Sequence, residues 1–145
     1  MTGGTTRVIR SETMTVRLKD DIVLARQMVR ARAMELGFGL TDQTRLVTAA
    51  SELARNTVDH GGGGTMTIEE VSDGEREGLR IIFEDHGPGM ADVARALQDG
   101  FSTMGGLGLG LGGARRLMDE LQIESESDKG TRVTAVRWRG GRGKP

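Results

Sequence analysis

The sequence predicts an α+β fold: a two-layer α/β sandwich whose mostly antiparallel sheet is covered by helices on one face. Two amphipathic helical segments lie in the first half of the chain. Two pairs of short apolar segments follow, and each pair is joined by a turn that contains glycine. This order of helices and hairpins favours two layers. At 145 residues, a single domain over residues 1–145 is expected.

The first expected element is a strand-like segment at residues 7–18. Ser11 and Glu12 interrupt its apolar residues, which predicts a turn inside the segment. A helix is expected next at residues 20–36, with Asp20 as its N-cap. Its apolar face is formed at helical spacing by Ile22, Ala25, Val29, Ala33 and Leu36.

A second helix is expected at residues 41–60. Thr41 is its predicted N-cap, and Asp42 in the first turn suits the helix dipole. The helix should end at His60, where the glycine run 61–64 begins. Its buried face is expected to consist of Leu46, Ala49, Ala50 and Leu53.

The second half of the chain predicts two hairpins separated by helical and glycine-rich segments. Glycine-containing turns at residues 72–74 and 128–130 close the hairpins. The ends, residues 1–6 and 139–145, are expected to be flexible because they are rich in glycine and polar residues. The remaining expected elements are strands at 65–71, 79–84, 123–127 and 132–138, a short helix at 91–97, a glycine-rich stretch at 100–113 and a helix at 114–121.

Composition excludes several classes of function. The formal net charge is -1, so nothing in the overall charge indicates nucleic acid or an anionic membrane as a partner. The chain contains no cysteine, which excludes disulfides, thiolate zinc sites and cysteine nucleophiles. The sequence shows no signal peptide and no apolar run of membrane-spanning length. We therefore expect a cytoplasmic protein without a membrane or nucleic-acid partner.

The first candidate motif lies on the second predicted helix. Glu52 and Asn56 are four residues apart, so their side chains share one face. An amide oxygen beside a carboxylate suits Mg²⁺-nucleotide chemistry, because Mg²⁺ takes oxygen ligands and Glu52 could accept a proton. Taken alone, the pair is more typical of an ordinary solvated helix face, because such spacings are common on exposed helices.

The second candidate motif follows the apolar strand at 79–84. Asp85 precedes Gly87 and Gly89, with Pro88 between the two glycines. Glycines allow the backbone to approach a ligand closely, and a carboxylate at this point can accept a hydrogen bond from an exocyclic amine such as that of adenine. A tight loop with a capping aspartate is the alternative interpretation.

The third candidate motif combines glycines with alternating leucines before a helix. Free N–H groups at a helix start can bind phosphates, and the leucines could anchor a closing lid. The alternative is a flexible linker, although linkers favour serine over regular leucine. No Gly-Lys-Ser/Thr sequence follows, and the surroundings are not a strand–helix–strand unit, which excludes the common phosphate and dinucleotide loops. The candidate nucleotide-binding residues here are Gly105, Gly106, Leu107, Gly108, Leu109 and Gly110.

Together the motifs resemble the GHKL ATP-binding family, which is shared by gyrase, heat-shock chaperone ATPases, histidine kinases and the mismatch-repair protein MutL. The family pattern is Glu-x-x-x-Asn, Asp-x-Gly-x-Gly, Gly-x-Gly and a late Gly-Thr. These correspond to Glu52/Asn56, Asp85/Gly87/Gly89, Gly108/Gly110 and Gly130-Thr131. The resemblance implies the Bergerat ATP-binding fold with ATP and Mg²⁺ as cofactors. It also implies that Asn56 holds Mg²⁺, Asp85 reads adenine, Thr131 supports Asp85 through water, and Glu52 is the catalytic base.

The resemblance can be narrowed to small regulatory kinases. Gyrase, the chaperones and MutL need further domains, and a histidine kinase needs a phospho-accepting histidine on a dimerisation helix, whereas the only histidines here, His60 and His86, lie in or beside the motifs. The surroundings of the motifs are most similar to stressosome switch kinases (RsbT-like), with anti-sigma factor kinases next. The segments that carry this similarity are 51–56, 99–103, 105–111, 116–120, 123–125 and the strand ending at Trp138.

The resemblance to switch kinases implies a partner-switching function. Such a kinase phosphorylates serine or threonine on STAS-domain proteins of the stressosome, and then activates a PP2C-type phosphatase in sigma-factor control. Two alternatives remain open. One is an anti-sigma factor kinase that sequesters a sigma factor and phosphorylates an anti-anti-sigma factor. The other is a nucleotide-gated binding module with little catalysis, against which the presence of Glu52 argues.

Overall fold

The computed structural model describes residues 5–90 and 109–139 of the chain. The described residues form five strands and three helices. The strands are β1 (Arg7–Val16), β2 (Gly64–Ser72), β3 (Glu77–Asp85), β4 (Glu120–Glu126) and β5 (Gly130–Trp138). The helices are α1 (Lys19–Glu35), α2 (Leu40–Asp59) and α4 (Leu109–Leu117). The predicted helix at 91–97 and most of the glycine-rich stretch lie outside the described residues.

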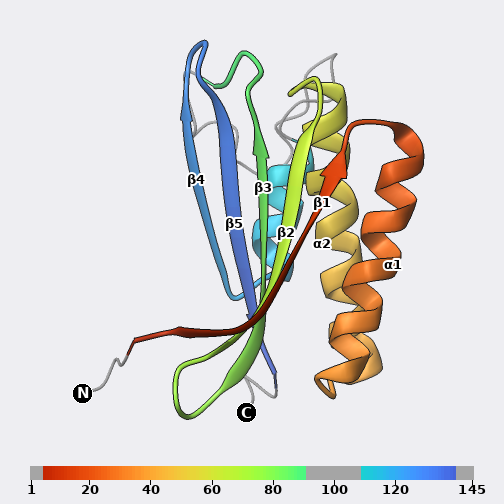
Figure 1. Cartoon of the computed structure of the whole chain (residues 1–145), viewed down its shortest axis with the longest axis vertical. Coiled ribbons are helices and arrows are strands. Elements are labelled where there is room, and N and C mark those ends of the chain that lie inside the picture. Colours follow the sequence, from red (N-terminus) through yellow and green to blue (C-terminus); the bar gives the residue numbers. More distant parts are fainter. Residues whose placement is uncertain (1–4, 91–108, 140–145) are drawn as a thin grey trace.

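The five strands form one antiparallel sheet in the order β1-β2-β3-β5-β4. Figure 1 shows α1, α2 and α4 together on one face of this sheet. The predicted α+β fold with two layers is therefore confirmed. Helix α2 is the central helix, because it packs against α1, α4 and the middle of the sheet.

The core lies between α2 and the inner face of the sheet. All four predicted buried residues of α2 are buried, and so are four of the five predicted for α1. Leu36, the fifth, follows the end of α1 and is only half-buried. The strands contribute alternate residues to this core, as expected when one sheet face is covered. These strand residues include Met66, Ile68, Leu79, Ile81, Phe83, Val133 and Ala135.

The predicted turn at Ser11 and Glu12 is wrong, because β1 runs through both residues. Ser11 lies opposite Glu69 and Glu12 opposite Ile68, so both belong to the ladder with β2. The irregularity lies earlier in the strand, where the register shifts between Val8 and Arg10. Pairing with a neighbouring strand overrides a weak local turn signal.

The two predicted N-caps are also wrong. The N-cap of helix α1 is Leu18. The capping side chain is Asp21 and not Asp20: its carboxylate accepts hydrogen bonds from the backbone N–H groups of Arg17 and Leu18 at 2.9 and 3.0 Å. These backbone hydrogen bonds, that from Arg17 first, lower the pKa of Asp21.

Helix α2 begins at Leu40 with Gly39 as its N-cap, one residue before the predicted start at Thr41. The side chain of Gln43 donates a hydrogen bond to the carbonyl of Phe38 at 2.8 Å, which holds the chain in place where it enters α2. The predicted C-terminal end is confirmed, since His60 is the C-cap.

The last helix starts earlier and ends earlier than predicted. The expected range was 114–121, whereas α4 spans Leu109–Leu117 and the chain then enters β4 at Glu120. Glycine normally lowers helix stability, and α4 contains three glycines. Packing against α2 compensates, because Leu111 and Ala114 of α4, and Met118 directly after it, are buried in the core.

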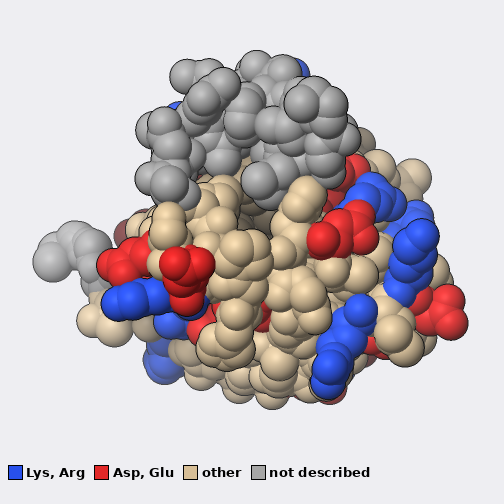
Figure 2. Space-filling model, turned by 90° about the horizontal axis from the view of Figure 1, so that it is seen from above, with Lys and Arg blue, Asp and Glu red and all other residues tan. Residues whose placement is uncertain are grey.

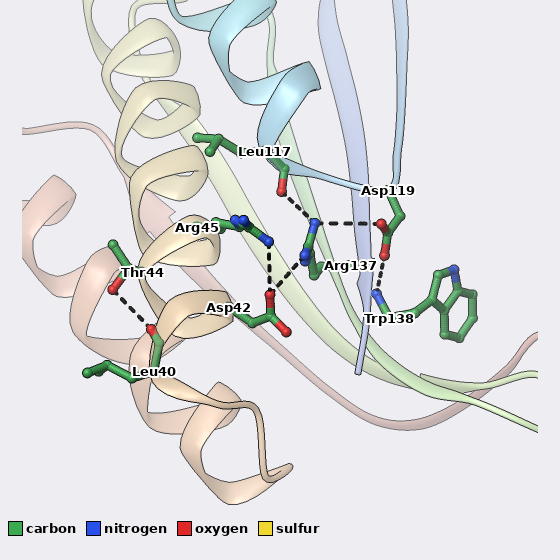
Figure 3. A network of polar contacts seen from close by, with 8 residues as sticks. All are labelled: Leu40, Asp42, Thr44, Arg45, Leu117, Asp119, Arg137 and Trp138. Atoms are coloured by element: carbon green, nitrogen blue, oxygen red, sulfur yellow. Dashed lines mark hydrogen bonds and ion pairs between the residues drawn. The ribbon is translucent and has the colours of Figure 1, made fainter. Parts of the chain in front are cut away.

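An ion network fastens the end of α4 to α2 and β5 (Figure 3). The Arg137 guanidinium donates to Asp42 at 2.8 Å and to the Leu117 carbonyl at 3.2 Å. It also lies 3.6 Å from a carboxylate oxygen of Asp119, whose other oxygen accepts the backbone N–H of Trp138 at 2.8 Å. The network therefore joins three elements at the end of the molecule opposite the candidate site.

Candidate functional site

A pocket that is partly open to solvent lies where α2 and β3 end and β5 begins. Four predicted nucleotide-binding residues line it: Asn56, Asp85, Gly89 and Thr131. Figure 2 shows the molecule from this end. Among the described residues, charged side chains of both signs lie towards the outside, and uncharged residues lie between them. The remaining lining residues are Leu53, Thr57, His60, Gly61, Phe83, Pro88, Met90, Leu111 and Val133.

Asp85 is the last residue of β3 and lies at the centre of the sheet edge. It faces Gly64 of β2 on one side and Thr131 of β5 on the other. Its Oδ1 accepts the backbone N–H of Gly87 at 2.9 Å. A Cβ atom at Gly61 would overlap the Asp85 carboxyl group, so only glycine leaves room for this side chain. The carboxylate is thus held in the pocket by its own loop.

The loop after Asp85 is clamped against the β4–β5 turn. Gly89 has a φ of 72°, and a Cβ atom there would overlap the Glu126 carbonyl. The backbone N–H of Asp128 donates to the Pro88 carbonyl at 2.6 Å. Gly89 therefore meets both requirements that favour glycine, a left-handed backbone and a close approach. This explains why the motif has a glycine at position 89.

Ser125 of β4 connects the pocket loop with the β4–β5 hairpin. Its Oγ accepts the backbone N–H of Met90 at 2.8 Å and donates to the Gly130 carbonyl at 2.9 Å. It also lies 2.8 Å from the Thr131 Oγ1. The segment 123–125 carries part of the resemblance to switch kinases, but the sequence predicts no role for Ser125 itself. Its position two residues after Ile123, on the inner face of β4, is the signal that could have placed it beside the pocket.

Asn56 lies in the last turns of α2 and points a polar atom into a buried position. Its Nδ2 is buried and has no hydrogen-bond partner in the described part of the chain. A buried amide without a partner is unusual and calls for a ligand or an ordered water. The side chain can offer N–H groups to phosphate oxygens and its oxygen to a cation.

Glu52 lies one turn before Asn56 and does not line the pocket itself. Its side chain is 32% exposed and its Oε2 is 3.5 Å from the guanidinium of Arg55. This carboxylate is partly accessible to solvent, so a group that arrives from outside can reach it. The spacing of Glu52 and Asn56 on one helix face is as the sequence predicted.

The pocket walls are apolar, and sequence reasoning missed them. Leu53 and Phe83 are buried core residues that also face the pocket, as do Leu111 and Val133. An apolar pocket with a few polar groups is typical of sites for small organic ligands, including flat heterocycles. The signal was available in the alternation of β3, where Phe83 stands two residues before Asp85 on the same face.

The predicted lid falls mainly outside the described residues, which include none of Gly105, Gly106, Leu107 and Gly108. Leu109 and Gly110 are the first two residues of α4, so the structure places them in a helix and not in the predicted loop. The start of α4 lies beside the pocket, since Leu111 lines it. A helix start at this point is compatible with binding an anion.

The described residues contain no group of three or more His, Cys, Asp or Glu side chains that could hold a metal ion by themselves. A cation here would therefore need ligands from substrate and water, which is how Mg²⁺ is commonly bound with nucleotides. None of the described helices has the length and apolar character needed to span a membrane.

Comparison with known proteins identifies the family. Residues 41–139 match the model for the histidine kinase-, DNA gyrase B-, and HSP90-like ATPases. The chain belongs to this family. The matched residues run from the first turn of α2 to the end of β5 and include the whole pocket. The predicted GHKL family is thereby confirmed, and ATP use follows from it.

Two curated relatives support a narrower group within the family. The chain is 52% identical over 118 residues to the serine/threonine-protein kinase RsbT of Bacillus subtilis, covering 81% of this chain and 89% of the relative. It is 35% identical over 115 residues to an anti-sigma F factor of Clostridium kluyveri, covering 75% and 80%. The predicted class, a partner-switching serine/threonine kinase of the GHKL family, is confirmed by these similarities.

A solved structure supports the fold. The crystal structure of the RsbU and RsbW domains of a Mycobacterium tuberculosis protein matches with a TM-score of 0.64 at 22% identity. The match covers 94% of this chain but only 35% of that chain, so this chain corresponds to about a third of the longer protein.

Proposed function

We propose that this chain is an ATP-dependent protein serine/threonine kinase that binds MgATP in the pocket beside Asp85 and Asn56. The single observation that carries the proposal is that four predicted nucleotide-binding residues from three separate motifs meet in this one apolar pocket. An adenine ring fits apolar walls, and Asp85 supplies an acceptor for its amine. The similarity to a serine/threonine kinase across 81% of the chain supports the same class.

Mg²⁺ fits the donor set of this site. Asn56 lines the pocket, and its side-chain oxygen would be one neutral ligand for Mg²⁺, which keeps several waters and takes substrate phosphates as its other ligands. Bound there, the ion would neutralise phosphate charge. The chain's own contribution is to hold the nucleotide and to exclude water from its base, with Thr131 assisting Asp85 through a water.

Glu52 is the proposed general base. It accepts the proton of the acceptor hydroxyl while the bond from oxygen to the γ-phosphorus forms, and the bond to the leaving ADP oxygen breaks. Such a base contributes roughly 10²–10⁴-fold to the rate, and most of the remaining catalysis comes from positioning and charge neutralisation. The partly exposed position of Glu52 suits a proton that arrives on another protein.

The proposed acceptors are STAS-domain proteins of the stressosome, and the proposed next partner is a PP2C-type phosphatase. The identity to RsbT favours this switch-kinase function. The similarity to anti-sigma F factors favours a second candidate, a kinase that also sequesters a sigma factor. The predicted glycine-rich segment, residues 105–108, and the start of α4 would bind the phosphates in either case.

The function is tested with γ-labelled ATP and a panel of purified STAS-domain proteins and sigma factors. The proposal predicts transfer of label to serine or threonine of at least one STAS protein. Stable co-purification with a sigma factor would favour the second candidate. Absence of transfer to every acceptor, from a protein that binds ATP, would contradict both kinase candidates.

The site is tested by calorimetry with MgATP. Asn56→Ala and Asp85→Asn should each weaken ATP binding at least about tenfold, the effect expected when a charged or ion-binding partner is lost. Gln122→Ala is the matched control, because Gln122 is exposed on the uncovered face of the sheet. Wild-type affinity in both site variants would refute the assignment of the pocket.

A further inference from the structure

The Ser125 hydroxyl has three hydrogen-bond partners, which is the full capacity of a serine hydroxyl. Its Oγ lies 2.8 Å from the Met90 backbone nitrogen, 2.9 Å from the Gly130 carbonyl oxygen and 2.8 Å from the Thr131 Oγ1. Met90 and Thr131 both line the pocket, and Thr131 is the one of these partners that has a side-chain hydroxyl. The question is which of the two hydroxyl groups donates to the other.

Counting hydrogens answers it. A serine hydroxyl has one hydrogen and can accept two more bonds. The Gly130 carbonyl has no hydrogen to give, and two oxygens 2.9 Å apart repel each other unless a hydrogen lies between them. The hydrogen of Ser125 therefore points at Gly130. Ser125 then accepts from the Met90 N–H and from the Thr131 O–H, which completes its capacity.

The consequence falls on the pocket. The only hydrogen of Thr131 is directed back at Ser125, so its Oγ1 can face the pocket only as an acceptor. Asp85 lies directly opposite Thr131 in the β3–β5 ladder and is also an acceptor when ionised. Two neighbouring acceptors favour a ligand amine and disfavour a ligand carbonyl at the same position, whether the contact is direct or through a water.

We propose that Ser125 is a positioning residue: it fixes the direction of the Thr131 hydroxyl and so contributes to the selection of a 6-aminopurine over a 6-oxopurine. The inference rests on the proposed function, because it needs a purine in this pocket with its 6-position near Asp85. It assigns to Ser125 an effect on specificity that a role in hairpin stability alone would not have.

The test compares ATP with inosine triphosphate, which carries a carbonyl in place of the 6-amine and a hydrogen on N1. Calorimetry gives both affinities, with Mg²⁺, for the wild type and for Ser125→Ala. The variant frees the Thr131 hydrogen to donate into the pocket, so the ratio of ATP to inosine triphosphate affinity should fall about fivefold, the effect of one hydrogen bond. Ser125→Thr keeps a hydroxyl and should restore the ratio.

Two further variants separate positioning from stability. Ser127→Ala, in the exposed turn of the same hairpin, should leave the ratio unchanged. Thr131→Val removes the hydroxyl that Ser125 directs, without touching Ser125, and should lower the ratio by itself. In the Thr131→Val background, Ser125→Ala should then have no further effect on the ratio, which is the signature of action through Thr131.

The outcomes distinguish the inference from the function on which it rests. If Ser125→Ala weakens both nucleotides equally, or if its effect persists in the Thr131→Val background, the positioning role is refuted. If the wild type binds ATP but Thr131→Val keeps the wild-type ratio, the inference is refuted while the ATP site stands. If the wild type does not bind ATP at all, the proposed function is refuted first.

Discussion

Arg137 is expected to be one of the most important single side chains for the stability of this chain. Its guanidinium contacts Asp42 at 2.8 Å, the Leu117 carbonyl at 3.2 Å and Asp119 at 3.6 Å (Figure 3). The side chains of the three charged residues are only 16%, 24% and 18% exposed, in the order Arg137, Asp42 and Asp119. Arg137→Ala would leave two poorly solvated carboxylates facing a cavity.

The magnitude follows from this burial. Removing one partner of a buried ion pair costs about 3–5 kcal/mol, because the remaining charge is left without compensation. The carboxylates keep some contact with water, Asp42 keeps its ion pair with Arg45 at 3.4 Å, and Asp119 keeps the Trp138 N–H at 2.8 Å. We therefore expect the lower end, about 3 kcal/mol. That is a large part of the roughly 5–15 kcal/mol by which domains are stable. With a typical urea m-value, the unfolding midpoint should fall by about 1–3 M.

The assay is urea unfolding followed by circular dichroism at pH 7 without nucleotide. Arg132→Ala is the matched control on the same strand: its ion pair with Glu84 is 3.8 Å long, and the two side chains are 50% and 47% exposed. That change should cost at most about 1 kcal/mol. Adding Asp42→Asn to Arg137→Ala should recover part of the lost stability, because it removes one of the two carboxylate charges that Arg137 contacted. A difference of less than about 1 kcal/mol between Arg137→Ala and the control would refute the reasoning.

Two further predictions concern glycine and acid stability. Gly64→Ala should lower the free energy of unfolding in urea by at least about 2 kcal/mol, because the added Cβ would overlap the Glu84 carbonyl. Gly39→Ala is the control: nothing lies close to its added Cβ, so it should change the stability by less than about 1 kcal/mol. Equal effects of the two changes would contradict the prediction. Backbone N–H groups, that of Arg76 first, lower the pKa of Asp73 from 3.8 to about 2. Because the folded pKa is the lower one, the stabilisation is complete above pH ~4 and is lost as pH falls towards 2. Asp73→Asn should therefore flatten the acid limb of the stability profile over that range, and an unchanged limb would refute the link.

The fold could be predicted because its elements carry regular patterns. The helical spacing of buried residues in α1 and α2 and the glycine turns of the two hairpins gave the layers and most of the strands. The caps could not be predicted, since Asp21 caps through backbone groups of the preceding extended chain. The start of α4 could not be predicted either, because packing against α2 overrides the low helix propensity of its glycines.

The site could be predicted in part. Asn56, Asp85, Gly89 and Thr131 were found from motifs, since each motif places a polar group or a glycine near the end or the beginning of a strand or helix. The apolar walls and the connections of Ser125 depend on which strands are neighbours in space. Sequence spacing does not give the order β1-β2-β3-β5-β4, which is what brings β4 beside Thr131.

Phosphoryl transfer by Glu52→Gln tests the central claim most directly, namely that this pocket is an ATP site served by Glu52 as the base. Labelled transfer and ATP affinity would be measured together for the wild type, Glu52→Gln and the control Asp59→Asn, which makes the same kind of change on the exposed part of α2. The account predicts that Glu52→Gln binds ATP like the wild type and loses transfer at least about 10²-fold. Undiminished transfer by Glu52→Gln would contradict it.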